Sequence, residues 1–296
     1  MNNFLFLGGD MRSIYAAKRL GRSYDCFIYG FDEPIAAPET PVLREISKFK
    51  SLVLPLPAST DGVNINAPYF KRPIALETIP EAVYAGGTVY CGKLCPALRK
   101  ICDESNLELV DYFEREELAV MNAIPTAEGT LEIIMRERGS TIFGSSILIT
   151  GYGRITKVLV KYLSSMGAGV TVTARKYSDL AWAEIMGCEA VHISEINNAL
   201  EKFDVIINTV PARIFDADRL KRLKTDCLIV DLASKTGIED MELARREGIN
   251  VIWALSLPGK VAPITAGNII ADTIMNILSE NAAGSGAELS GGGVNA

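Results

Sequence analysis

The stretch from Ser146 to Val160, SILITGYGRITKVLV, constrains the fold of this chain more than any other. A short run rich in β-branched and aliphatic residues meets a turn with glycine at 151 and 153, and apolar residues at helical spacing follow at once. A strand, a tight turn and a helix form the unit that cradles a dinucleotide pyrophosphate, because the glycines allow close backbone approach and the first-turn amides face the anion. Thr156 replaces the third glycine of that fingerprint, so the motif needs support from its surroundings.

Strand and helix patterns alternate along the whole chain. Strands are predicted at 3–7, 26–29, 51–56, 88–91 and 107–110, and again at 146–150, 169–174, 189–193, 204–210, 227–233 and 250–255. Helices are predicted between them, for example at 11–20 and 96–105. This alternation predicts an α/β protein of two doubly wound parallel-sheet domains. The first is expected to be flavodoxin-like and the second a Rossmann NAD(P)-binding domain, with a ligand-binding cleft between them.

The chain length of 296 residues fits two domains, which we expect at 1–125 and 126–280. Pro125 interrupts a helix-compatible stretch, and because proline disfavours helix before it, one helix is expected to end near Ala123 and another to start at Thr126. A final helix at 265–280 is long enough to pack back on the first domain. Residues 281–296 are small and polar, which predicts a disordered tail.

Charge and composition exclude several classes of function. With 30 basic and 36 acidic residues the net charge is −6, so we expect no nucleic-acid partner. No signal peptide and no apolar run of roughly 18 residues is evident, so we expect a cytoplasmic protein without a membrane segment. The six cysteines are expected to be reduced. The spacing of Cys91, Cys95 and Cys102 matches no common zinc pattern, so no metal is expected.

The strand predicted at 169–174 is followed by Arg175 and Lys176, where an NAD site would carry a carboxylate for the ribose hydroxyls. Two cations favour the 2′-phosphate of NADP over NAD, with solvated loop charges as the alternative. The predicted cofactor-binding residues come from the glycine turn, this strand end and two later strand ends: Gly151, Tyr152, Gly153, Arg154, Ile155, Ala174, Arg175, Lys176, Thr209, Val210, Pro211 and Ala233.

A second glycine turn, GGDMR at 8–12, lies at the first strand-to-helix junction. We predict that Arg12 and the first-turn amides bind a substrate carboxylate there, with Asp10 at the same site. A helix cap is the alternative for Asp10. Ser59 and Thr60 follow the third strand on the same sheet edge and offer hydroxyl donors to substrate, although an ordinary polar turn explains them nearly as well.

The remaining candidates lie late in the chain. Two prolines and two glycines in LPGKVAPITAG (257–267) are expected to fix a loop that holds Lys260, as the substrate cation, and Thr265 in the catalytic site. Asp231 at a strand end is the candidate base, and a carboxylate that braces its own loop is the alternative. His192, the one histidine, is expected to be a bystander because its sheet edge faces the adenosine side.

Three of these stretches, NAIPTAEGT (122–130), DLASKTG (231–237) and LPGKVAPITAG, resemble the A subunit of dipicolinate synthase, and the GGDMR and GYGR turns fit as well. The resemblance runs from about residue 4 to about residue 278. It implies an NAD(P)-dependent oxidation of dihydrodipicolinate to pyridine-2,6-dicarboxylate, the calcium-chelating acid of bacterial endospores. It also implies a partner, a flavoprotein-like B subunit. Thr156 departs from the third glycine that is usual in the family.

Our functional hypothesis is therefore an NADP-dependent dehydrogenase that acts with a B subunit in spore formation. Two alternatives stay open: a non-catalytic NADP-binding subunit, and a different two-domain NAD(P)-dependent dehydrogenase acting on a small carboxylate. A ring with two carboxylates needs two anion sites, which Arg12 with the Ser59–Thr60 turn and Lys260 would supply. We also expect the chain to form homo-oligomers.

Overall fold

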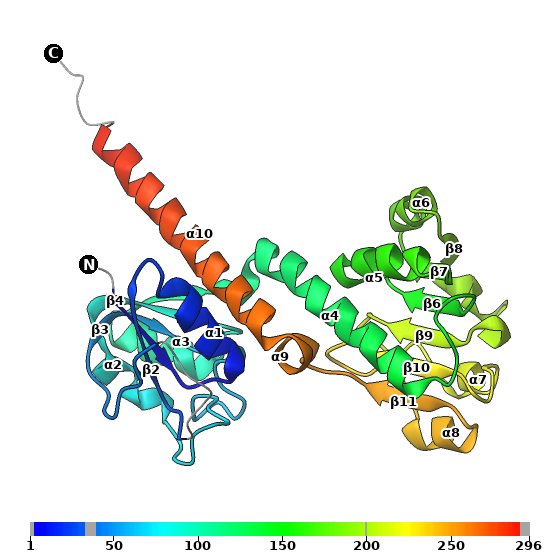
Figure 1. Ribbon diagram of the computed structural model, residues 1–296, viewed down its shortest axis with the longest axis horizontal. Coiled ribbons are helices and arrows are strands. Elements are labelled where there is room, and N and C mark those ends of the chain that lie inside the picture. The colour runs from blue at the N-terminus through cyan, green and yellow to red at the C-terminus, as the bar shows by residue number, and fades with distance from the viewer. Residues whose placement is uncertain (1–2, 33–39, 199, 291–296) are drawn as a thin grey trace. The chain divides into compact units, whose positions relative to one another are not determined.

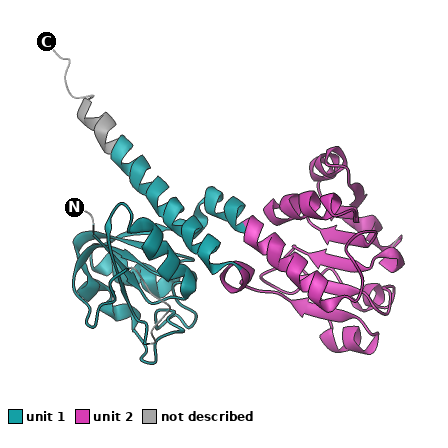
Figure 2. Ribbon diagram, in the orientation of Figure 1, with its two compact units in different colours: residues 1–122, 262–296 teal, residues 123–261 magenta. Residues whose placement is uncertain are grey.

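The computed structural model describes residues 3–32, 40–198 and 200–290. The chain divides into two compact units, unit 1 with residues 1–122 and 262–296, and unit 2 with residues 123–261 (Figure 2). The division falls inside one long helix, α4 (Glu116–Glu137), and after a short one, α9 (Leu257–Val261). The first division thus lies three residues before the expected boundary at 125, and the final helix α10 (Pro263–Ser290) groups with unit 1.

Unit 1 is built on a parallel sheet whose described strands follow the order β2-β1-β3-β4-β5. The strands are β1 (Asn3–Leu7), β2 (Asp25–Tyr29), β3 (Phe49–Val53), β4 (Val83–Cys91) and β5 (Glu108–Asp111). Its helices are α1 (Met11–Leu20), α2 (Ile79–Ala82), α3 (Pro96–Glu104) and α10, with 3₁₀ turns at Leu76–Thr78 and Tyr112–Glu114. This strand order is that of flavodoxin-like sheets, which confirms the predicted class of the first domain.

The alternation of side chains along β1 decides which helices cover which face of the sheet. Phe4 and Phe6 are buried in one cluster with residues of α1 and α10, whereas Leu5 and Leu7 are buried in a second cluster with residues of α2 and α3. Successive residues of a strand point to opposite faces, so an uninterrupted apolar strand requires helices on both sides. The sequence NFLFL therefore encodes a central, doubly covered strand.

Helix α10 packs against α1 within unit 1, and a glycine sets the closeness of that packing. A Cβ atom on Gly267 would lie 2.5 Å from the Arg12 carbonyl oxygen and 2.7 Å from the Tyr15 Cβ. Isoleucines of α10, at 269, 270, 274 and 277, then fill the core beside α1. Gly267 thus lets α10 cover α1 at the helix that begins the Arg12 turn.

Replacing Gly267 with valine should lower the free energy of unfolding by about 1–3 kcal/mol, because overpacking forces the two helices apart. Thermal unfolding measures this, with Gly139→Val as the control, since a Cβ on Gly139 has no atom within 4 Å. Equal midpoints for the two variants would contradict the close approach of α10 to α1.

Unit 2 contains a parallel sheet whose described strands follow the order β11-β10-β9-β6-β7-β8 (Figure 1). The strands are β6 (Ser146–Thr150), β7 (Gly169–Ala174), β8 (Glu189–His192), β9 (Val205–Asn208), β10 (Leu228–Asp231) and β11 (Asn250–Trp253). Counted from the first strand of this unit, the order is 3-2-1-4-5-6, which is the Rossmann arrangement. The predicted second domain is confirmed, with each expected strand present and shorter or equal in length.

Helices cover both faces of the second sheet. The helical elements of this unit are the part of α4 from residue 123 onward, α5 (Arg154–Ser165), α6 (Tyr177–Ile185), α7 (Ala217–Leu220), α8 (Met241–Arg246) and α9, with 3₁₀ turns at Ile193–Asn198 and Leu200–Lys202. Ile147 and Ile149 of β6 are buried in a cluster with residues of α4 and α5, whereas Leu148 is buried with residues of α7 and α8. Strand β6, which leads into the glycine turn, is therefore packed against helices on both faces of the sheet.

Three local predictions differ from the structure: a helix break at Pro125, an irregular loop at 257–267 and a disordered tail from residue 281. Helix α4 runs through Pro125 without a break, because Ala123, Pro125 and Ala127 are all buried and their burial offsets the one backbone hydrogen bond that proline removes. The segment 257–267 is helical rather than an irregular loop: α9 starts at Leu257 and α10 starts at Pro263, where proline is favourable in a first helical turn. Helix α10 also continues to Ser290 through part of the expected tail, and residues 291–296 lie outside the described residues.

Candidate functional site

The glycine turn after β6 has the backbone geometry that a dinucleotide cradle needs. Gly151 has φ +84°, and a Cβ there would lie 2.8 Å from both Thr209 Oγ1 and Val210 Cγ2. Gly153 precedes α5 without a side-chain cap, and a Cβ added to it would meet no described atom within 4 Å. The space beside Gly153, at the start of α5, is therefore open. This arrangement fits a pyrophosphate.

Thr156 fits the turn without disturbing it. The residue is fully buried, and its hydroxyl donates to the Gly151 carbonyl oxygen at 3.0 Å and lies 3.5 Å from Thr209 Oγ1. The hydroxyl of Thr209 in turn donates to the Thr150 carbonyl oxygen at 2.6 Å. A threonine at the third position of the fingerprint thus replaces close packing by hydrogen bonds that hold the turn.

A cavity of about 500 Å³ opens beside this turn, in the size range of small-molecule sites. Its lining includes seven of the predicted cofactor residues: Gly151, Tyr152, Ala174, Arg175, Lys176, Val210 and Pro211. Burial raises the pKa of the Tyr152 phenol, so that side chain stays neutral in the wall. The cavity also contains Thr173, whose hydroxyl is buried without a described hydrogen-bond partner. An orphaned hydroxyl in a cavity wall is a group that a ligand can satisfy.

Six charged or apolar residues of the same cavity were not among the predicted cofactor residues: Asp179, Ile193, Ala212, Arg213, Ile214 and Arg219. Arg213 lines the cavity together with Arg175 and Lys176 and adds a third cation to them. Its side chain is 76% exposed, and its Nη1 lies 3.6 Å from Glu239 Oε1. Arg219 is occupied, because it donates to Asn197 Oδ1 and to the Ile214 carbonyl oxygen. In the sequence, Arg213 stands two residues after the predicted cofactor residue Pro211, which could have suggested its place at the cavity. No motif distinguishes this segment from an ordinary loop.

The other predicted cofactor residues do not line this cavity. Gly153, Arg154 and Ile155 form the turn and the start of α5, and Ile155 packs against the core of unit 2. Thr209 braces Thr150 as described above. Ala233 is buried, donates its N–H to Asp231 and accepts a hydrogen bond from the indole of Trp253.

Asp231 is a bracing carboxylate in the structure, which favours the bracing alternative, and its role as a catalytic base stays a prediction. The residue is fully buried and accepts four hydrogen bonds. Their donors are Asn208 Nδ2 at 2.8 Å, the N–H groups of Ala233 at 3.1 Å and Gly237 at 2.7 Å, and Thr236 Oγ1 at 3.0 Å. A base needs a lone pair directed at substrate, and these donors occupy the carboxylate. Asn208, which the sequence did not single out, connects Asp231 to Thr150 Oγ1 across three strands.

Replacing Asp231 with asparagine should lower the free energy of unfolding by about 1–3 kcal/mol, since one amide NH₂ would then face donor groups. The pH profile of kcat should keep its shape. Chemical denaturation and a kcat profile measure these, with the exposed Asp226→Asn as control. A fall in kcat of about 10² or more at unchanged stability would restore the base hypothesis.

In unit 1 the turn after β1 holds Arg12 firmly. The Arg12 guanidinium donates to both Asp10 oxygens, at 3.0 and 3.1 Å from Nε and 2.7 Å from Nη2, and Nη2 also donates to the Leu56 carbonyl oxygen at 2.6 Å. Asp10 also caps α1 through the Arg12 N–H. Nη1 has no acceptor among the described residues and remains available to an anion. Asp10 therefore caps α1 and holds Arg12, as the helix-cap alternative expects, and its contact with substrate stays a prediction.

The Ser59 hydroxyl belongs to a polar turn. It donates to Asp61 Oδ1 at 3.1 Å and accepts from the Gly62 N–H at 2.9 Å, so its one hydrogen is used. Hydrogen bonds from Asn64 and Val63 hold the pKa of Asp61 well below its usual range. These hydrogen bonds favour the polar-turn alternative for Ser59, and Thr60 is exposed; the substrate contacts of both residues stay predictions.

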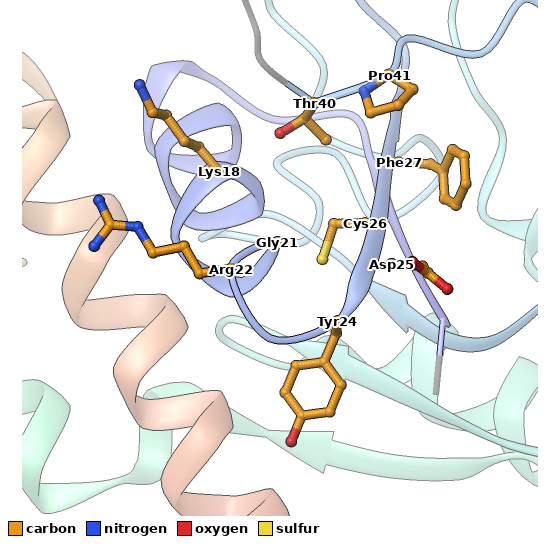
Figure 3. A pocket seen from close by; sticks show the side chains of 9 residues that line it. All are labelled: Lys18, Gly21, Arg22, Tyr24, Asp25, Cys26, Phe27, Thr40 and Pro41. Atoms are coloured by element: carbon orange, nitrogen blue, oxygen red, sulfur yellow. The ribbon is translucent and has the colours of Figure 1, made fainter. Parts of the chain in front are cut away.

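Lys260 is exposed on α9 in unit 2 and Thr265 is exposed on α10 in unit 1. Both stay predictions. A separate cavity of about 320 Å³ lies in unit 1 where α1 ends and β2 begins, and Figure 3 shows its lining. It is at the amino end of β2, away from the strand ends that carry the Arg12 turn, so it is not part of this site.

The cysteines are free thiols, and all except the half-buried Cys95 are buried. Burial raises the pKa of the Cys102 thiol to about 11. Within the described residues, no group of three or more His, Cys, Asp or Glu side chains is arranged to hold a metal ion. No helix in the described part of the chain is long and apolar enough to cross a membrane.

Two family models match the chain. One, for the N-terminal domain of the dipicolinate synthase A subunit, matches residues 3–113, and one for the NAD binding domain of D-isomer specific 2-hydroxyacid dehydrogenases matches residues 126–245. The dipicolinate synthase A subunit of Bacillus subtilis (strain 168) is 30% identical over 281 residues, which is 93% of this chain and 95% of that protein.

Solved structures agree with these matches. The crystal structure of the dipicolinate synthase A subunit from Bacillus halodurans has a TM-score of 0.85 at 30% identity and covers 94% of this chain and 97% of its own. The crystal structure of the Bacillus subtilis protein has a TM-score of 0.84 at 29% identity, with 95% and 97% covered.

The nicotinamide-binding family matches the part of the chain that carries the glycine turn and the cavity. The chain is thus an NAD(P)-dependent oxidoreductase. Its similarity extends over both units and over nearly the full length of the Bacillus subtilis protein. The chain belongs to the family of dipicolinate synthase A subunits.

Proposed function

We propose that this protein oxidises dihydrodipicolinate to dipicolinate with NADP, together with a flavoprotein-like B subunit, during endospore formation. The observation that supports NADP is the charge of the unit 2 cavity, where Arg175, Lys176 and Arg213 are three cations of the lining. Its one carboxylate, Asp179, is on α6 and not at the end of β7, where an acidic residue would bind the ribose hydroxyls of NAD.

Unit 2 would hold the cofactor through the Gly151–Gly153 turn and the first-turn amides of α5, and Arg175 would bind the 2′-phosphate. Bound NADP supplies the hydride acceptor. On the substrate side, Arg12 would bind a ring carboxylate through its available Nη1. Lys260 of unit 2 is a separate candidate for a carboxylate contact. Thr265 is a further candidate for a substrate contact.

The chain would act mainly by orienting substrate. Oxidation would remove a hydride from a ring carbon, which the bound cofactor would accept, and one proton, and the product ring would be aromatic. The stability of the aromatic product lessens the need for a strong base. This suits a chain in which the Asp231 carboxylate already accepts hydrogen bonds from its own loop. A fixed Arg12 that meets a carboxylate lowers the barrier by positioning.

The test follows NADPH absorbance with dihydrodipicolinate in three samples: the purified chain, the B subunit, and both together. We expect turnover by the pair that stops when the chain is omitted. A chain that binds NADP while the B subunit turns over without it would show a non-catalytic role for the chain instead. No turnover by the pair would overturn the substrate assignment.

A further inference from the structure

His192, the one histidine of the chain, lies beside the strand end that presents Arg175. It is the last residue of β8 and pairs in register with Ala174, the last residue of β7. Ala174 and Arg175 line the cofactor cavity, and so does Ile193, the residue after the histidine. The imidazole is therefore a neighbour of the cavity and not one of its lining groups.

The hydrogen-bond partners of the ring indicate which neutral tautomer fits them. Nε2 lies 3.2 Å from the Arg175 carbonyl oxygen, and Nδ1 lies 3.3 Å from the Ser194 N–H nitrogen and 2.7 Å from Ser194 Oγ. A carbonyl oxygen only accepts and a backbone N–H only donates. The neutral tautomer with hydrogen on Nε2 satisfies both, so His192 donates to the backbone of Arg175.

The same imidazole contacts the residue that follows the two cations. The Tyr177 ring stacks on it with centroids 5.3 Å apart and planes at 17°. Tyr177 is the first residue of α6. His192 thus holds both ends of the segment 175–177, and among the described residues it makes the one side-chain hydrogen bond to that segment.

We propose that His192 is a positioning residue for cofactor choice, which fixes the 175–177 segment so that Arg175 meets the 2′-phosphate of NADP. This inference rests on the proposed NADP dependence. Arg175 and Lys176 are exposed, and a mobile cation must be ordered when it binds phosphate. When the backbone of the segment is already fixed, less entropy is lost on binding. This raises the affinity for NADP, which carries the 2′-phosphate, and not the affinity for NAD.

The test compares His192→Ala, His192→Gln and His192→Asn in the full chain by titration calorimetry with NADP and with NAD. A glutamine amide can reach the place of Nε2, whereas asparagine reaches only the place of Nδ1. We expect alanine and asparagine to raise the Kd for NADP about tenfold, the size of one hydrogen bond, with less than about a twofold change for NAD. Glutamine should restore most of the NADP affinity. At saturating NADP, the kcat of the chain with its B subunit should not change.

The outcomes separate this inference from the function on which it rests. A wild-type chain without preference for NADP would overturn the cofactor assignment and this inference together. A wild-type preference that survives in His192→Ala would overturn this inference alone. Equal losses for NADP and NAD, or equal behaviour of glutamine and asparagine, would show a merely structural histidine, and thermal unfolding of each variant would confirm that it is folded.

Discussion

Replacing Arg12 with alanine is expected to raise the KM for dihydrodipicolinate by roughly 100- to 1000-fold, about 3–4 kcal/mol. The guanidinium is fixed by both oxygens of Asp10 and by the Leu56 carbonyl, and its side chain is only 12% exposed. A carboxylate bound by this group loses a charge-assisted hydrogen bond in a partly desolvated place. The Asp10 carboxylate, left without its partner, would also repel the substrate.

Steady-state kinetics of the chain with its B subunit measures this effect, and Arg19→Ala is the matched control. Arg19 is on the same helix and pairs with Asp272 at 2.9 Å, so its loss removes an ion pair of α1 without touching the turn. A KM unchanged in Arg12→Ala, or raised equally in both variants, would contradict the assignment of Arg12 to a substrate carboxylate.

Replacing Arg175 with aspartate is expected to raise the Kd for NADP about 100-fold, near 3 kcal/mol, and to remove the preference for NADP over NAD. The change removes a forked cation from the cavity and adds a carboxylate, which repels the 2′-phosphate and can bind ribose hydroxyls. Binding titrations with both cofactors measure it.

The control for Arg175→Asp is Arg245→Asp, which makes the same charge change on α8, where Arg245 is exposed and pairs with Glu242. An unchanged ratio of the two dissociation constants in Arg175→Asp would refute the role of Arg175. A similar shift in the control would show a general effect of net charge.

The fold was predictable because local patterns determined it. The apolar run NFLFL and the SILIT–GYG junction each predict a strand and the residue at which it ends. The alternation of such strands with helices then allows only a few topologies. The break expected at Pro125 was wrong because burial of its neighbours, a tertiary effect, outweighed a local preference.

The candidate site was predictable only in part. The glycine turn and the cations after β7 depend on residues adjacent in sequence, and the structure places them at one cavity. Whether Asp231 is a base or a brace depends on donors from Asn208 and Thr236 that no spacing rule brings together. The place of Arg213 likewise depends on how the loop after β9 folds.

Two glycines, one in NAIPTAEGT and one in LPGKVAPITAG, allow close helix packing that could not be predicted from the sequence. A Cβ on Gly129 of NAIPTAEGT would lie 3.1 Å from Val261 Cγ2 and 3.3 Å from Leu257 Cβ, both in LPGKVAPITAG. Gly267, at the end of the latter motif, meets the backbone of Arg12 in the GGDMR turn. These motifs are thus points where α4 meets α9 and α10 meets α1.

The most direct measurement of the central claim is the ratio of NADPH to dipicolinate formed when dihydrodipicolinate and NADP are added to the chain with its B subunit. Hydride transfer to NADP predicts one NADPH for each dipicolinate, and no dipicolinate when NADP is left out. Dipicolinate formed at the same rate without NADP, or NADPH formed without dipicolinate, would contradict the account.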